Sequence, residues 1–90
     1  MIFEWNDEKA SANARKHGVT FHEAASVFGD PLALTFADPG HSIQERRYLT
    51  FGVSRFDRRL VVSHADYGER VRIISARAMT RSEKRTYEEG

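Results

Sequence analysis

The sequence predicts a small α+β protein in which helices cover a mostly antiparallel sheet, with the element order β-α-α-β-β-β-β-α. Three observations lead to this prediction. Helix-capping patterns occur in the first quarter of the chain and again near its end. Between them, apolar and polar residues alternate as they do in half-buried strands. The 90 residues suffice for one domain but not for two, so we expect a single domain over 1–90.

The N-terminal part of the chain should form a short strand and two helices. Apolar residues predict the strand at 2–5. A helix over 7–17 is predicted because an Asn-Asp pair can cap its start and Gly18 follows its end. The Thr-Phe-His-Glu sequence at 20–23 is a capping box, so a second helix should begin there and end at the Gly-Asp-Pro sequence of 29–31.

Four strands and a final helix should complete the fold. The strands are expected at 32–36, 45–53, 60–65 and 70–77, joined by short turns that favour an antiparallel meander. The last helix should begin at a second capping box and run over 80–89. Helices on one face of the sheet would leave the other face partly free for a ligand.

The composition excludes several kinds of site and favours a polyanionic partner. Without cysteine, the chain has no disulfide, no thiolate metal ligand and no thiol nucleophile. Between residues 46 and 85, eleven basic side chains, ten of them arginine, outnumber four acidic ones. Arginine suits bidentate phosphate binding, although a solvated sheet surface is the alternative. With no secretory signal and no apolar run of membrane-spanning length, we expect a cytoplasmic protein without a membrane partner.

The sequence resembles the BrnT family of toxins over nearly its whole length. The residues that carry the resemblance near the start are Phe3-Glu4-Trp5, Lys9, Asn13, Lys16-His17-Gly18, Phe21 and Glu23-Ala24. Those in the middle are Asp38, His41-Ser42, Glu45, Arg47 and Gly52. The most distinctive lie at the end, and they are Arg72-Ile73-Ile74-Ser75-Ala76-Arg77, Glu83 and Tyr87-Glu88.

The resemblance implies a RelE/ParE-like fold and a ribonuclease toxin of a type II toxin–antitoxin system, with RNA as its substrate and no cofactor. It further implies a BrnA-like antitoxin, a ribbon-helix-helix protein that masks the toxin and binds operator DNA, and it suggests a toxin homodimer. One departure is the sequence Asp57-Arg58-Arg59, where the family often has a Gly-Arg pair. Either Arg58 or Arg59 could therefore take the family position and bind substrate.

Metal-independent RNA cleavage needs a base for the 2′-hydroxyl, an acid for the 5′-oxygen and cations for the charged phosphorane. The sequence has no dense carboxylate cluster, so we expect no metal site. Histidine suits the acid and base roles because its pKa lies near neutrality. His41 and His64 are catalytic candidates, with a structural role as an equal alternative for His64. His17 ends a predicted helix, where it could bind substrate or simply stabilise the helix dipole.

One carboxylate and two arginines are the other catalytic candidates. Glu45 and Arg47 lie two residues apart on one predicted strand face, where they could form a base beside its phosphate clamp or a plain surface ion pair. Arg77 is predicted to share a strand face with Val71, Ile73 and Ser75 and to point from a rigid sheet edge at a transition-state phosphate.

The remaining candidates for substrate binding come from both ends of the chain. Lys9, Asn13 and His17 are spaced by four residues, so they lie on one helical stripe that is either an RNA-facing wall or a solvated face. Tyr87 could stack on a base or anchor the last helix to the sheet. Arg72 should project to the face opposite Arg77 and is a weaker candidate than that arginine.

Other functions fit the same sequence. A non-catalytic nucleic-acid-binding protein or a gyrase-directed inhibitor of the ParE kind would share the fold, and fold alone does not separate these functions. A degenerate toxin that only holds its antitoxin on DNA is another hypothesis, against which the intact set of histidines and arginines argues.

Overall fold

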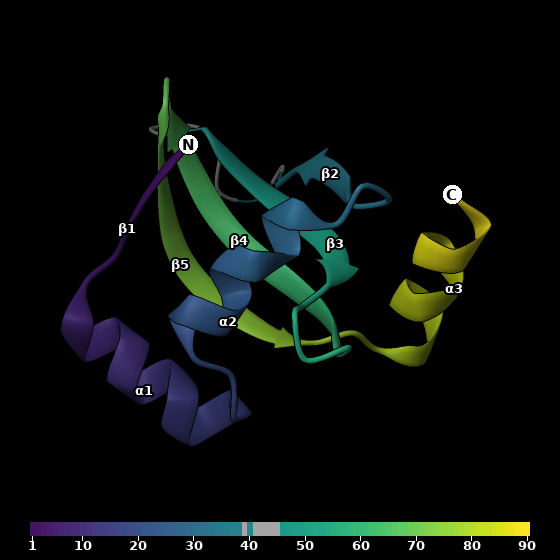
Figure 1. The fold of residues 1–90 in the computed structure, drawn as a ribbon, viewed down its shortest axis with the longest axis horizontal. Coiled ribbons are helices and arrows are strands. Elements are labelled where there is room, and N and C mark those ends of the chain that lie inside the picture. The colour runs from purple at the N-terminus through teal and green to yellow at the C-terminus, as the bar shows by residue number, and fades with distance from the viewer. Residues whose placement is uncertain (39, 41–45) are drawn as a thin grey trace.

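A five-stranded sheet with three α-helices and a short 3-10 helix makes up the structure, a computed structural model that describes residues 1–38, 40 and 46–90 (Figure 1). In chain order the elements are β1 (Ile2–Glu4), α1 (Asp7–His17), α2 (Phe21–Ser26), η1 (Val27–Gly29), β2 (Leu34–Ala37), β3 (Arg47–Val53), β4 (Arg59–Tyr67), β5 (Arg70–Ala78) and α3 (Arg81–Glu89). This order confirms the predicted fold class.

The second strand begins later than the sequence predicts. It was expected at 32–36, and it starts at Leu34. The Asp30 carboxylate accepts a hydrogen bond from the backbone N–H of Leu32, and the Asp30 carbonyl accepts one from Ala33. These two hydrogen bonds fold residues 30–33 into a turn, which keeps Leu32 out of the sheet.

Four of the strands form the predicted antiparallel meander, and the first strand joins it in parallel. The sheet order is β1-β5-β4-β3-β2. Each of the later strands pairs with its chain neighbour in antiparallel register. β1 pairs with β5 over only three residues, up to Arg72, and the chain then leaves the sheet to enter α1. β1 therefore covers only the first part of the outer edge of β5.

α1 and α2 lie on one face of the sheet and bury the main core between themselves and the central strands (Figure 1). The fully or nearly fully buried residues of this core are Val19, Phe21, Ala24, Val27, Leu60, Val62, Ile73 and Ala76. α1 begins where predicted, because the Asn6 side chain accepts a hydrogen bond from the backbone N–H of Lys9. It ends at Gly18, whose φ of 68° is left-handed.

A β-bulge changes which side chains of β5 face this core. At His64 the pairing between β4 and β5 skips one residue of β5, Ile74. One extra residue in a strand moves every later side chain to the other face. Arg77 therefore lies on the face opposite Val71 and Ile73, so that part of the prediction is wrong, although Arg77 does share a face with Ser75. Arg72 lies on this same face, and the prediction that it projects away from Arg77 is also wrong.

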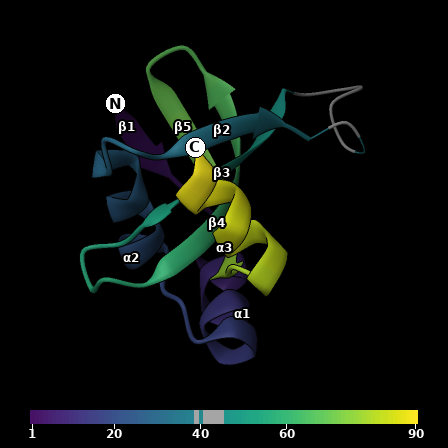
Figure 2. The same ribbon diagram turned by 90° about the vertical axis from the view of Figure 1, so that its right-hand side faces the viewer.

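α3 packs against the other face of the sheet and covers one end of it (Figure 2). Its Tyr87 joins a second apolar cluster with Phe51, Val61 and Met79. The Tyr87 hydroxyl donates a 2.6 Å hydrogen bond to Asp30, which raises the pKa of the tyrosine. No helix of the described residues packs on the other end of this face. We call the whole of this face, opposite α1 and α2, the open face. None of these helices is long and apolar enough to cross a membrane.

Candidate functional site

Two arginines lie in one row across the open face. Residues paired across strands share a face, so Arg47 of β3, Ala65 of β4 and Arg72 of β5 line up. The backbones of the two arginines are two strand spacings apart, roughly 10 Å. The half-buried Ser63 and Ser75 pair with each other in the neighbouring row. This surface offers guanidinium and hydroxyl groups, which suit the phosphate and ribose groups of a nucleic acid.

Arg77 lies further along the open face, beside α3. It pairs with Val61 of the second apolar cluster. Its guanidinium donates hydrogen bonds of 2.7 and 2.9 Å to the two carboxylate oxygens of Glu83. Glu83 also closes the capping box with Thr80. Hydrogen bonds from Arg77 lower the pKa of Glu83 from 4.5 to about 2, and the same pair raises the pKa of Arg77. The predicted catalytic arginine is thus held by a bidentate ion pair.

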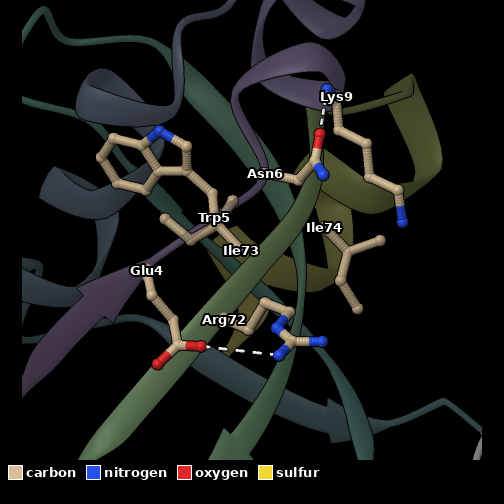
Figure 3. Close-up of a pocket in the computed structure, with 7 residues that line it drawn as sticks. All are labelled: Glu4, Trp5, Asn6, Lys9, Arg72, Ile73 and Ile74. Carbon is tan, nitrogen blue, oxygen red and sulfur yellow. Dashed lines mark hydrogen bonds and ion pairs between the residues drawn. The ribbon is translucent and has the colours of Figure 1, made fainter.

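A pocket of about 340 Å³ opens at the sheet edge where the chain passes from β1 into α1 (Figure 3). We call it the edge pocket. Its lining residues are Glu4, Trp5, Asn6, Lys9, Arg72, Ile73 and Ile74. Figure 3 shows Lys9 and Arg72 on either side of Ile74. The early end of β1 and the bulge in β5 both fall here, so the pocket occupies the place where the regular sheet edge is interrupted.

The edge pocket carries more positive than negative charge. The Glu4 carboxylate lies 3.6 Å from the Arg72 guanidinium and 3.3 Å from that of Arg70, so one anion serves two cations. Arg72 also lies over the Tyr67 ring, 5.5 Å from its centre. Among the residues that the structure describes, no carboxylate pairs with the Lys9 ammonium group. The pocket therefore suits an anionic ligand.

His64 lies on the helix-covered face, away from the row of arginines. Its ring is 2% exposed and packs against Phe28 and Tyr48. Nδ1 lies 2.7 Å from the Asp66 carboxylate, which can only accept, so Nδ1 donates. Nε2 lies 2.7 Å from the Thr50 hydroxyl. Both ring nitrogens are engaged inside the protein, so the geometry favours the structural alternative for this histidine.

Asn13 is also buried, although it was predicted to bind substrate. Its amide donates 2.9 Å hydrogen bonds to the carbonyls of Val19 and Ala76, and its oxygen accepts one of 3.0 Å from the Ala76 N–H. Asn13 thus satisfies both backbone groups of Ala76, as a neighbouring strand would. This geometry gives Asn13 a structural role in place of a contact with substrate. Lys9, one turn earlier, lines the edge pocket, and His17, one turn later, is exposed.

The two arginines of the altered turn have different surroundings. Arg58 forms an ion pair with Glu23, which is 3% exposed, and also donates to the Gly18 carbonyl. The hydrogen bond from Arg58 holds the pKa of Glu23 below its usual value. Arg58 therefore ties α2 to the turn between β3 and β4. Arg59 lies 3.4 Å from Glu88 of α3, and its side chain is about as exposed as that of Arg58, so the two differ in their partners and not in their accessibility.

The catalytic candidates His41 and Glu45 lie outside the described residues. Arg47, two residues after Glu45, is half-buried at the start of β3. Within residues 1–38, 40 and 46–90, no group of three or more histidine or acidic side chains is arranged to hold a metal ion. Within the described residues, the candidate RNA-binding site consists of the open face and the edge pocket.

Comparison with known proteins decides the family. The family model described as "Ribonuclease toxin, BrnT, of type II toxin-antitoxin system" matches residues 5–83. The chain belongs to the BrnT family. The crystal structure of the Brucella abortus ribonuclease toxin, BrnT, shares the fold with a TM-score of 0.69 and 20% identity, over 90% of this chain and 100% of that one. A search of curated proteins finds no match. The family resemblance seen in the sequence is confirmed.

Of the seven residues that line the edge pocket in this BrnT family member, only Lys9 and Arg72 were predicted to bind substrate. Among the missed ones, Glu4 and Trp5 were not predicted as site residues. A signal was available, because both belong to the group of residues near the start that carries the resemblance to BrnT toxins. Ser63 and Ser75 were missed as well: Ser75 belongs to the most distinctive stretch of that resemblance, whereas Ser63 carries no distinctive pattern.

Proposed function

We propose that this member of the BrnT family is an endoribonuclease toxin that cleaves RNA without a metal ion and is neutralised by a BrnA-like antitoxin. The observation that carries the proposal is the row of Arg47 and Arg72 on the open face, in a chain that matches a ribonuclease toxin family over residues 5–83. Guanidinium groups suit the phosphates of RNA because they donate parallel hydrogen bonds to two oxygens.

In the proposed reaction, the 2′-oxygen of a ribose attacks the adjacent phosphorus while a base removes its proton. The 5′-oxygen leaves as an acid protonates it, so the products are a 2′,3′-cyclic phosphate and a 5′-hydroxyl. His41 and Glu45 are our candidates for the base and the acid, since imidazole and carboxylate groups can both transfer protons. Arg47 follows them in the chain and would stabilise the charge on the phosphorane.

Arg77 is our second candidate for stabilising that charge. Two contacts to Glu83 and one of 3.2 Å to the Ala78 carbonyl fix the orientation of its guanidinium. A guanidinium has five N–H groups, so part of this donor set stays available for a phosphate. Holding a donor in place before the reaction strengthens its effect on the transition state.

The antitoxin is expected to act by covering the RNA-binding surface. A ribbon-helix-helix protein of the BrnA kind would mask the toxin and bring the complex to operator DNA, and a toxin homodimer would fit such an assembly. Co-expression of the antitoxin candidate encoded beside the toxin should restore growth, and the two proteins should purify together. Persistent growth arrest despite co-expression would contradict this part of the proposal.

The enzymatic part is tested by expression of single alanine variants. Wild-type protein should arrest growth and produce RNA fragments, and His41→Ala, Glu45→Ala and Arg47→Ala should each reduce cleavage, by roughly a hundredfold for the arginine. Arg15→Ala is a matched control, because Arg15 is exposed on α1, away from the open face. Intact RNA during growth arrest would contradict the proposal, and a DNA-damage response would then indicate gyrase inhibition.

A further inference from the structure

We propose that the edge pocket binds a phosphodiester group of the RNA that flanks the one being cleaved. The pocket is then a binding subsite with Lys9 and Arg72 as its phosphate ligands. This inference rests on the proposed RNA substrate, and it adds a place where the substrate is held apart from the reaction.

The position of the pocket supports this assignment. Arg72 belongs both to the row of arginines on the open face and to the lining of the pocket. Since its backbone is roughly 10 Å from that of Arg47, the two guanidinium groups would contact different phosphates of one strand. An RNA strand that lies across the open face at Arg47 would thus continue over Arg72 to Lys9 at the sheet edge.

The charges in the pocket are available to a ligand. Lys9 has no acidic partner among the described residues. Arg72 lies 3.6 Å from Glu4, which is longer than a hydrogen bond, and its side chain is 50% exposed. Glu4 divides its charge between this arginine and Arg70. A phosphate could therefore accept hydrogen bonds from Lys9 and Arg72 without breaking a strong ion pair.

Two other hollows beside α1 lack this combination. One is lined by Asp7 and His22 but by no lysine or arginine. The other holds two carboxylates, those of Asp7 and Glu8, against a single Arg15. Both would repel a phosphate or hold it weakly. The edge pocket is the one of these three in which cations outnumber anions.

The tryptophan in the pocket lining gives a direct readout. Trp5 is the single tryptophan of the chain and lines both the edge pocket and the neighbouring hollow beside His22, so its emission reports on binding at this end of α1, and the Lys9 and Arg72 variants below assign the signal to the edge pocket. The full-length protein would be titrated with a 2′-O-methyl RNA oligonucleotide, which has no free 2′-hydroxyl and cannot be cleaved. We expect the Trp5 emission to change as the oligonucleotide binds, with the same Kd as fluorescence anisotropy of a labelled oligonucleotide.

Charge removal identifies the ligands. For single strands, each neutralised phosphate contributes about 0.7 to the slope of log K against log salt, so Lys9→Ala and Arg72→Ala should each lower the slope by that amount. The matching loss of affinity is roughly fourfold at 0.15 M salt. Lys16→Ala removes the same charge from an exposed position of α1 outside the pocket and should leave slope and affinity unchanged. Circular dichroism would verify that all variants are folded.

The outcomes separate this inference from the proposed function. Equal affinities for the wild type, Lys9→Ala and Arg72→Ala, or RNA binding without any change in Trp5 emission, would overturn the subsite even if the protein cleaves RNA. Dependence of binding on both cations would uphold the subsite even if no cleavage is found. With cleavable RNA, a flanking subsite predicts that Lys9→Ala raises KM and leaves kcat within about twofold.

Discussion

The ion pair between Arg77 and Glu83 joins β5 to α3, and Glu83→Gln would separate its structural contribution from any role in catalysis. In the folded protein the pKa of Glu83 falls from 4.5 to about 2, first because of hydrogen bonds from Arg77. Each pH unit of such a decrease corresponds to about 1.4 kcal/mol, which gives an upper value of roughly 3 kcal/mol. The Arg77 side chain is 39% exposed, so water screens the pair, and we expect a loss of roughly 1–2 kcal/mol.

The pH dependence of this loss follows from the sign of the shift. A carboxyl group whose pKa is lowered by folding stabilises the protein above its unfolded pKa, and this contribution disappears as the pH falls from about 4.5 towards 2. Urea denaturation at pH 7 should therefore show Glu83→Gln to be less stable than the wild type. The difference should shrink towards zero at pH 2, provided that both proteins still fold there. Equal stability at pH 7, or a difference that does not change with pH, would show that the ion pair between Arg77 and Glu83 does not stabilise the fold.

Activity measurements on the same variants address the guanidinium itself. Glu83→Gln leaves the guanidinium of Arg77 present but held less firmly, so we expect RNA cleavage to be reduced and still measurable at a temperature where the variant is folded. Arg77→Ala should abolish cleavage under the same conditions, and Arg77→Lys should restore little of it because an ammonium cannot bind bidentately. If Arg77 only supports the fold, Arg77→Ala and Arg77→Lys will lower activity only in proportion to the fraction of protein that is unfolded.

Three further substitutions test the packing that supports the site, each by urea denaturation at pH 7. Asn13→Ala leaves the backbone groups of Ala76 unpaired and should cost roughly 3 kcal/mol, whereas a loss below 1 would contradict the strand-like role of its amide. His64→Phe keeps the aromatic packing but removes two hydrogen bonds, so roughly 2 kcal/mol should be lost; unchanged stability would show that these bonds contribute nothing. Gly52→Ala would place its Cβ 2.8 Å from a methyl group of Val27, and we expect a loss of roughly 1–3 kcal/mol, against which wild-type stability would count.

The helices could be predicted because their signals are local. Thr20 and Thr80 each accept a hydrogen bond from the backbone N–H three residues later, at 3.1 and 3.2 Å. Asn6 does the same at the start of α1. Every partner lies within one helical turn, so the pattern can be seen in a short stretch of sequence.

The orientation of side chains in β5 could not be predicted in the same way. Alternation holds within a strand, but a bulge depends on how that strand pairs with its neighbour. Ile74 has no pairing partner in β4, and this extra residue places Arg77 on the face opposite Ile73. Asn13 was misjudged for a related reason, because its partner Ala76 is 63 residues away in the chain. A polar residue on a helix gives no local sign that a distant backbone requires its amide.

For the candidate site too, the sequence predicted which residue types bind substrate but not which residues contact one another. The excess of arginine predicted a phosphate-binding surface, and Lys9 and Arg72 were both named as substrate ligands. Their meeting in one pocket depends on the parallel pairing of β1 with β5, which joins segments from opposite ends of the chain and leaves no local pattern in the sequence. The carboxylates that hold Arg77 and Arg58 lie 6 and 35 residues from them, so only the structure distinguishes engaged cations from available ones.

The most direct test of the proposed function is the chemistry of the RNA ends that the purified protein produces in EDTA. Metal-independent attack by the 2′-hydroxyl predicts fragments with 2′,3′-cyclic phosphate and 5′-hydroxyl ends, formed at an undiminished rate when divalent ions are chelated. Intact RNA in EDTA, with cleavage restored by a divalent cation and products that carry 3′-hydroxyl ends, would contradict it.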